Sequence, residues 1–173
     1  SIKLMSKDLP DGRIMTELSG FIGSSTLKDK KGRSFVINGK TDVVVEFKTN
    51  PKKYGIIDLK TTSISPSKIQ NYKLQLEAYA TIFENPNSKT PKFSNIEELG
   101  LYLFEPKEIT KISDGNCNMK FETLYLKGNR CHEDLIKRVT DIIDIYLMKK
   151  PPEYNPACST CKFVISLKKE KYI

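Results

Sequence analysis

Apolar and polar residues follow two different periods along this chain, and each period predicts one type of secondary structure. In two segments, residues 65–83 and 129–150, the apolar residues recur every three or four positions, as on one side of an amphipathic helix. Short apolar runs bounded by glycine, proline or polar residues are instead typical of strands. Such runs cover residues 13–24, 35–47, 54–60, 99–104 and 119–126. The pattern therefore predicts a mixed α/β fold.

Residues at the ends of these segments predict where the helices and connections lie. Ser65 can cap the first helix and Pro66 suits its first turn. Asn129 can cap the second helix, which Pro151 and Pro152 would end. We expect the broad apolar face of this second helix to pack in the core. Three polar segments are expected to be connections, the first of them a hairpin loop: residues 27–33, 85–94 and 106–118.

Two aspartates fall where neighbouring strands would meet. If residues 35–47 and 54–60 pair through the polar loop between them, Asp42 lies beside Asp58. Side chains alternate across a strand, so Lys60 points to the same face as Asp58. Two adjacent carboxylates repel each other unless a cation lies between them, and oxygen ligands suit a hard ion such as Mg²⁺ or Mn²⁺. The spacing therefore favours a metal site, although a single aspartate near a strand end is more often a turn or surface residue.

Three short motifs in this region carry a family resemblance. Gly39 to Asp42 reads G-x-x-D, Asp58 to Lys60 reads (D/E)-x-K, and Gln75 to Tyr79, followed by Ala80, reads Q-x-x-x-Y-A. In this order the segment resembles the core of the PD-(D/E)xK nuclease superfamily. It is most similar to the RecB-like branch, which includes the nuclease domain of the RecBCD helicase–nuclease and the CRISPR-associated RecB-like exonucleases. The resemblance implies one restriction-endonuclease-like domain over residues 1–173, with a central mixed β-sheet flanked by helices.

The resemblance also implies the chemistry of the first two motifs. Asp42, Asp58 and the backbone carbonyl of Leu59 would hold Mg²⁺ or Mn²⁺. Lys60 would orient or deprotonate a water molecule, or stabilise the charge that develops on the phosphate. Family members usually carry one more acidic residue on the strand before G-x-x-D. Glu17 is a candidate for that position, although an exposed strand residue fits it equally well.

The third motif lies on the first predicted helix. Gln75 and Tyr79 are four positions apart and therefore share one side of that helix. From the apolar stripe alone, Tyr79 is a core aromatic residue and Gln75 its solvated neighbour. By resemblance, Gln75 reaches the metal site or a substrate phosphate, and Tyr79 positions it. We therefore include both residues among the catalytic candidates.

One family feature has no counterpart in this sequence. Members often carry a metal-binding histidine on a helix upstream of G-x-x-D. The only histidine here, His132, follows all three motifs. We assign it no such role and expect the upstream helical motif to be missing.

The four cysteines raise a separate question about a second metal. Cys158 and Cys161 form a C-x-x-C pair in the C-terminal tail, residues 151–173, which amounts to half of a metal site. Many RecB-like nucleases hold an iron–sulfur cluster with a C-terminal cysteine cluster. Here Cys117 and Cys131 can complete four ligands only if they lie close in space. We expect reduced thiols or a cluster remnant, so an iron–sulfur cluster is not favoured. Disulfide exchange is not favoured either, because the pair opens no clear helix after a strand.

Composition and charge narrow the class of protein. A chain of 173 residues suits one domain with a sizeable core, and 38% hydrophobic with 29% charged residues is typical of a folded chain. No apolar run approaches the roughly 20 residues of a membrane span, and no signal peptide is visible. We therefore expect an intracellular protein, cytoplasmic or associated with the nucleoid or nucleus, without a membrane partner. The net charge of +8 suits a polyanion such as DNA.

These observations together predict a metal-dependent nuclease. It would hydrolyse phosphodiester bonds of single- or double-stranded DNA, with exonuclease-type action in repair, recombination, phage or defence. One alternative is a domain of the same fold that binds nucleic acid or acts as a scaffold without turnover. Another is a metal or redox module centred on the cysteines.

Overall fold

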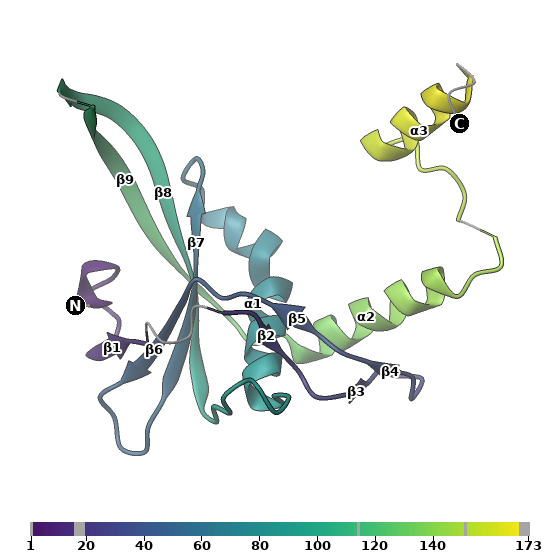
Figure 1. Ribbon diagram of the computed structural model, residues 1–173, viewed down its shortest axis with the longest axis horizontal. Coiled ribbons are helices and arrows are strands. Elements are labelled where there is room, and N and C mark those ends of the chain that lie inside the picture. The colour runs from purple at the N-terminus through teal and green to yellow at the C-terminus, as the bar shows by residue number, and fades with distance from the viewer. Residues whose placement is uncertain (1, 16–19, 114, 151, 170–173) are drawn as a thin grey trace.

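A five-stranded sheet forms the centre of the molecule in the computed structural model, which describes residues 2–15, 20–113, 115–150 and 152–169 (Figure 1). The strand order is β1-β6-β7-β8-β9. Only β7 and β8 run parallel; the other neighbouring pairs are antiparallel. The strands are β1 (Gly12–Ile14), β6 (Val43–Phe47), β7 (Tyr54–Thr61), β8 (Ile96–Ser113) and β9 (Asn116–Gly128). The predicted mixed sheet flanked by helices is therefore confirmed.

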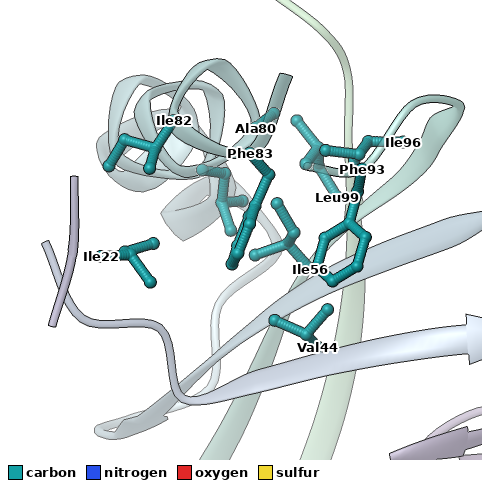
Figure 2. Packing of buried hydrophobic residues seen from close by; sticks show 10 residues of the cluster. Ile22, Val44, Ile56, Ala80, Ile82, Phe83, Phe93, Ile96 and Leu99 are labelled. Atoms are coloured by element: carbon teal, nitrogen blue, oxygen red, sulfur yellow. The ribbon is translucent and has the colours of Figure 1, made fainter. Parts of the chain in front are cut away.

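Helix α1 (Ile69–Glu84) connects the two parallel strands and covers one face of the sheet. Two parallel strands need such a crossover, because the chain must return from the end of the first strand to the opposite side of the sheet, where the second strand begins. Figure 2 shows α1 side chains packed on this face; Phe83 and Ile56, for example, are 0% and 1% exposed. The cluster consists of buried apolar residues: Ile22, Val44, Ile56, Leu76, Ala80, Ile82, Phe83, Phe93, Ile96 and Leu99. The cluster holds α1 above β7 and β8, which contribute Ile56, Ile96 and Leu99 to it.

The opposite face of the sheet has a thinner cover. Val45, Ile57 and Tyr102 point to this face and are buried. The N-terminal segment packs on them through Ile2, which belongs to the 3-10 helix η1 (Ile2–Leu4), and through Leu9. The two faces of the sheet thus have separate hydrophobic clusters, as alternation along the strands requires.

The segment expected as one strand over residues 35–47 is divided, so that prediction is wrong. Its parts are β4 (Ser34–Phe35), β5 (Asn38–Gly39) and β6. β4 pairs with β3 (Leu27–Lys28), and β5 pairs with β2 (Ile22–Gly23), as two small separate sheets. The predicted hairpin loop is confirmed between β3 and β4, where Gly32 has a φ of 75°. The strand expected over residues 13–24 contains β1 and β2, with residues 16–19 outside the described residues.

The connection expected over residues 106–118 is also wrong. β8 continues to Ser113 and β9 begins at Asn116, so the two strands form one long hairpin. The turn includes Gly115, whose φ of 77° suits a residue without a side chain. Polar residues interrupt the apolar pattern here because both faces of the distal hairpin are open to solvent, and a periodicity argument depends on one buried face.

The helix ends differ from their expected positions. Ser65 makes no side-chain cap; its hydroxyl lies 2.9 Å from that of Ser67 in the 3-10 turn η2 (Pro66–Lys68) that precedes α1. Helix α2 (His132–Tyr146) begins after Cys131, not Asn129, and it ends before the two prolines. The expectation that its apolar face packs in the core is wrong for the last turns, because Tyr146 is 85% exposed.

Helix α3 (Ser159–Lys169) stands apart from the sheet at the far end of the chain (Figure 1). The C-x-x-C pair therefore does open a helix, but the preceding element is α2 and not a strand, so the strand–helix arrangement that the sequence analysis did not find is not formed. Within the described ranges, none of the helices has the length and hydrophobicity of a membrane span.

Candidate active site

Asp42 and Asp58 meet because of the register between β6 and β7. The pairs Val44↔Ile56 and Val43↔Ile57 run toward the start of β6, and one further step places Asp42 opposite Asp58. Opposite residues of an antiparallel pair point to the same face. Asp42 Oδ2 also accepts a hydrogen bond of 2.8 Å from the backbone N–H of Leu59. The pairing expected between these strands is confirmed, and it brings the two carboxylates together on the face covered by α1.

Asp58 lies in a buried environment with strong polar neighbours. The residue is 2% exposed, and its Oδ2 lies 2.6 Å from Lys60 Nζ. Burial raises the pKa of the Asp58 carboxyl above its ordinary value, and Asp42 raises it further, against the opposing effect of Lys60. Burial alone would lower the pKa of Lys60, but the close contact with the charged carboxylate of Asp58 outweighs this effect and raises it. The attraction between the two charges favours the charged form of both side chains. For Lys60 this attraction outweighs the cost of burying a charge, and for Asp58 the cost of burial outweighs the attraction.

The three sequence motifs form one continuous set of contacts. Gln75 Nε2 donates to Asp58 Oδ1 at 3.1 Å and to the hydroxyl of Tyr79 at 2.8 Å. The ring of Tyr79 in turn lies against Gly39, where an added Cβ would approach Tyr79 Cε1 to 2.8 Å. Gly39 of the G-x-x-D motif therefore leaves room for the ring of Tyr79. Tyr79 in turn holds Gln75 against Asp58 of the (D/E)-x-K motif.

Sequence reasoning missed one neighbour of this site. The ring of Tyr72 lies below the ammonium group of Lys60, with Nζ 5.3 Å from the ring centroid. This distance is within the range of a cation–π interaction. Tyr72 precedes Gln75 by three positions on α1, so helical periodicity alone places the two side chains on the same side of the helix. Nothing in the sequence indicated that the lysine of the neighbouring strand would reach it.

The remaining site candidates do not join this set. Glu17 lies outside the described residues. The four cysteines are free: Cys158 and Cys161 lie together at the start of α3, whereas Cys117 lies on β9 and Cys131 directly precedes α2. Among the described residues, His, Cys, Asp and Glu side chains form no group of three or more that could hold a metal ion. The structure therefore does not assemble the four-cysteine site that the sequence left open.

The donor set around Asp58 fits a hard divalent cation. Asp58 Oδ2 is buried and contacts Lys60 Nζ, yet no partner in the described part of the chain gives it hydrogen-bond geometry. The proximity of Asp42 raises the pKa of Asp58, which a cation between the carboxylates would reverse. The available ligands are carboxylate and carbonyl oxygens, which Mg²⁺ and Mn²⁺ prefer.

Comparison with known proteins assigns the chain to a family. Residues 9–165 match the PD-(D/E)XK nuclease superfamily, and the chain belongs to this superfamily. No curated protein matches the sequence. Among solved structures, the crystal structure of SSO0001 is similar with a TM-score of 0.45 and 15% sequence identity. The match covers 95% of this chain and 61% of that one, so this chain spans about three fifths of its length.

Proposed function

We propose that this protein is a metal-dependent nuclease of the RecB-like branch that hydrolyses phosphodiester bonds in DNA by exonuclease-type action. The observation that carries the proposal is the contact set around Asp58, in which Lys60, Gln75 and the neighbouring Asp42 converge on one buried carboxylate. Superfamily membership supports nuclease chemistry. Repair, recombination, phage or defence processes are the contexts that fit such an activity.

In this proposal Asp42, Asp58 and the Leu59 carbonyl hold Mg²⁺ or Mn²⁺. A bound divalent ion supplies an activated water and neutralises charge on the scissile phosphate. Asp42 is kept in place by the Leu59 N–H. Gln75 fixes the orientation of Asp58 through Oδ1, which leaves Oδ2 toward Lys60.

Lys60 is the proposed positively charged group beside the reacting phosphate. Its ammonium lies against Asp58 and over the ring of Tyr72, so both neighbours favour the protonated form. A protonated lysine in this place orients the attacking water and stabilises the negative charge that develops on the phosphate oxygens.

The charge of the whole chain supports a nucleic-acid substrate. A net charge of +8 attracts the phosphate backbone and gives a binding free energy that weakens with salt. The four free cysteines support a reducing intracellular compartment.

The second candidate function is nucleic-acid binding without turnover. It is favoured by one observation: in the described part of the chain the site has two carboxylates and no third acidic or histidine ligand. A domain of this kind would retain DNA affinity with or without divalent ions.

A cleavage assay distinguishes the two functions. End-labelled linear and closed circular DNA, each single- and double-stranded, are incubated with Mg²⁺, Mn²⁺ or EDTA, with labelled RNA in parallel. We expect cleavage of linear DNA that needs the ion, and Lys60→Ala should reduce its rate by about 10²-fold or more while DNA binding persists. Cys158→Ser with Cys161→Ser is the matched control and should cleave normally. Undiminished cleavage by the Lys60 variant would refute the assignment, and binding without any cleavage would favour the second function.

A further inference from the structure

The distal part of the β8–β9 hairpin, residues 105–123, is here called the arm. The pairing of β7 with β8 ends at Thr61↔Phe104, so beyond this point the arm consists of two strands alone. Figure 1 shows it rising away from the rest of the molecule. Two strands without a third or a covering helix are marginally stable in water. The arm is therefore incomplete as an isolated structure.

Exposed apolar side chains lie on the arm. Ile109 is 54% exposed, while Met119 and Phe121 are each 43% exposed. Ile109 and Met119 are opposite each other across the hairpin, and Phe121 contacts the ring of Phe104 edge-on at 6.2 Å between centroids. An apolar row on a solvent-exposed hairpin indicates a surface that is covered in an assembly.

The outer edge of β9 has no neighbouring strand in the described part of the chain, because β9 ends the strand order of the sheet. A free edge presents a row of backbone donors and acceptors to any strand that can pair with it. Many proteins block such an edge with proline or a bulge. β9 contains no proline over Asn116–Gly128.

The charge of the arm argues against nucleic acid as its partner. Residues 105–123 contain three lysines and four acidic residues, in a chain whose overall charge is +8. A nearly neutral arm offers a phosphate backbone little attraction. On β9 the charged residues of the arm are one lysine and one glutamate two positions apart, Lys120 and Glu122, and such a pair suits another strand with the same pattern.

We propose that β9 pairs antiparallel with β9 of a second copy of this chain, around a twofold axis at Phe121. In this register Phe121 is opposite its own symmetry mate, and Lys120 of each copy is opposite Glu122 of the other. Both charged pairs lie on one face of the joined sheet and both phenyl rings on the other. A twofold contact of this kind is self-complementary and closes after two copies.

The charged residues are available for this contact. Lys120 is exposed and makes no ion pair among the described residues. Glu122 has 60% of its side chain exposed and contacts Lys107 at 3.0 Å, which leaves its other oxygen for a second cation. The joined edge is small, so the dimer is expected to dissociate in the micromolar range, on the order of 10 µM.

Sedimentation of the wild-type chain from about 1 to 300 µM tests the proposal directly, with Kd on the order of 10 µM expected. Lys120→Glu and Glu122→Lys each place like charges opposite each other twice. Each single variant should therefore raise the dissociation constant by about tenfold or more. An equimolar mixture of the two variants restores both opposite-charge pairs, so it should form a heterodimer with affinity within a few-fold of wild type.

The mixing experiment separates pairing from misfolding, because a variant damaged in its own fold is not rescued by the other. Circular dichroism and thermal unfolding of each variant provide the folding control. A wild-type chain that stays monomeric at 300 µM, or a mixture that stays monomeric, would overturn the proposal. Loss of DNA affinity in Lys120→Glu without a change of mass would likewise overturn it, in favour of a nucleic-acid contact.

Discussion

At the scale of single residues, Asp58 combines a proposed chemical role with a cost to the fold. Burial is the main cause that raises the pKa of its carboxyl, and the neighbouring Asp42 raises it further. Lys60 lowers this pKa but offsets only part of the increase. A carboxylate held in this way fits a site that a cation completes. The same feature gives a stability prediction that needs no knowledge of the substrate.

Asp58→Asn should stabilise the metal-free protein at neutral pH. A carboxyl whose pKa is higher in the folded state than in the unfolded state binds its proton more tightly when folded. Its contribution to the free energy of unfolding therefore falls as pH rises above the ordinary value of 3.8, until the folded-state pKa is passed. The asparagine variant lacks this loss.

The measurement is thermal unfolding in EDTA at several pH values. The melting temperature of Asp58→Asn should exceed that of wild type at pH 7, and the two should converge near pH 3, where Asp58 is protonated in both states. A lower melting temperature of the variant at pH 7 would mean that the ion pair with Lys60 outweighs burial.

Tyr72 tests whether the position of Lys60 matters. Tyr72→Leu removes the aromatic face below the ammonium, whereas Tyr72→Phe keeps it. We expect Tyr72→Leu to lower kcat about threefold to tenfold with KM little changed, and Tyr72→Phe to remain close to wild type. Steady-state cleavage kinetics provide the comparison. Equal loss in both variants would instead indicate a role for the hydroxyl group.

At the scale of elements, the site depends on how β5, β7 and α1 approach one another. Gly39 on β5 lies against the ring of Tyr79, and Tyr79 holds Gln75 beside Asp58. The short distance between Gly39 and the Tyr79 ring leaves no room for a side chain at position 39. A methyl group there should therefore disturb a hydrogen bond two contacts away.

Gly39→Ala should lower the free energy of unfolding by about 1–3 kcal/mol, because its Cβ would lie 2.8 Å from Tyr79 Cε1. Cleavage should fall with it as Gln75 loses its support. Gly20→Ala is the matched control, since no atom of the described residues lies within 4 Å of a Cβ at that position. Urea unfolding of both variants measures the effect, and equal stabilities of the two would show that Tyr79 moves aside at no cost.

The buried Glu77 joins α1 to the start of α2. Its side chain is fully buried, and it accepts hydrogen bonds of 2.9 Å from Arg130 Nε and Nη2 and of 2.8 Å from the Cys131 N–H. Arg130 also pairs with Glu84, whose side chain is 30% exposed. The junction therefore contains one buried and one partly exposed carboxylate around a single guanidinium.

Glu77→Ala should lower the free energy of unfolding by about 1–3 kcal/mol, because it leaves the Cys131 N–H without an acceptor and removes two hydrogen bonds of Arg130, which keeps its pair with Glu84. Glu84→Ala, measured in the same urea titration, should cost about 1 kcal/mol or less. A small effect at Glu77 would mean that water replaces the carboxylate at this junction.

The sequence was informative for elements whose surroundings are simple. The strand prediction for residues 54–60 was correct because both faces of β7 are buried from Gly55 to Asp58 and the strand contains the apolar residues Ile56, Ile57 and Leu59. The prediction for residues 35–47 was wrong because the chain passes through three different sheets, with breaks at residues 36–37 and 40–42. The arm misled because its apolar residues face solvent. In both cases the tertiary surroundings determined the secondary structure, and the periodicity of a sequence carries no information about those surroundings.

The candidate site shows the same division. Asp42, Asp58, Lys60, Gln75 and Tyr79 were named from motif order, and the structure brings them together. Tyr72 was missed because it contacts Lys60, which lies on β7. Spacing rules relate residues within one element and do not predict a contact between a helix and a strand.

At the scale of the whole molecule, the two groups of potential metal ligands belong to different parts of the chain. The carboxylates lie in the central sheet, and the C-x-x-C pair lies at α3, which stands apart from it (Figure 1). The Cys161 N–H donates to Cys158 Sγ at 3.4 Å, and hydrogen bonds from Cys161 lower the pKa of the Cys158 thiol. A thiolate is a good metal ligand, so a metal effect on stability has two possible origins.

Thermal unfolding with Mn²⁺ separates these origins, because an ion that binds only the folded chain stabilises it in proportion to its occupancy. At about 100 times its Kd, Mn²⁺ should add roughly 2.7 kcal/mol, which for a domain of this length raises the melting temperature by roughly 5–10 °C over EDTA. Asp42→Asn with Asp58→Asn should abolish this shift, and Cys158→Ser with Cys161→Ser should retain it. The reverse result would place the ion at the tail and remove the physical basis for catalysis at the sheet. The proposal of a metal-dependent nuclease therefore depends on which of the two double variants loses the shift.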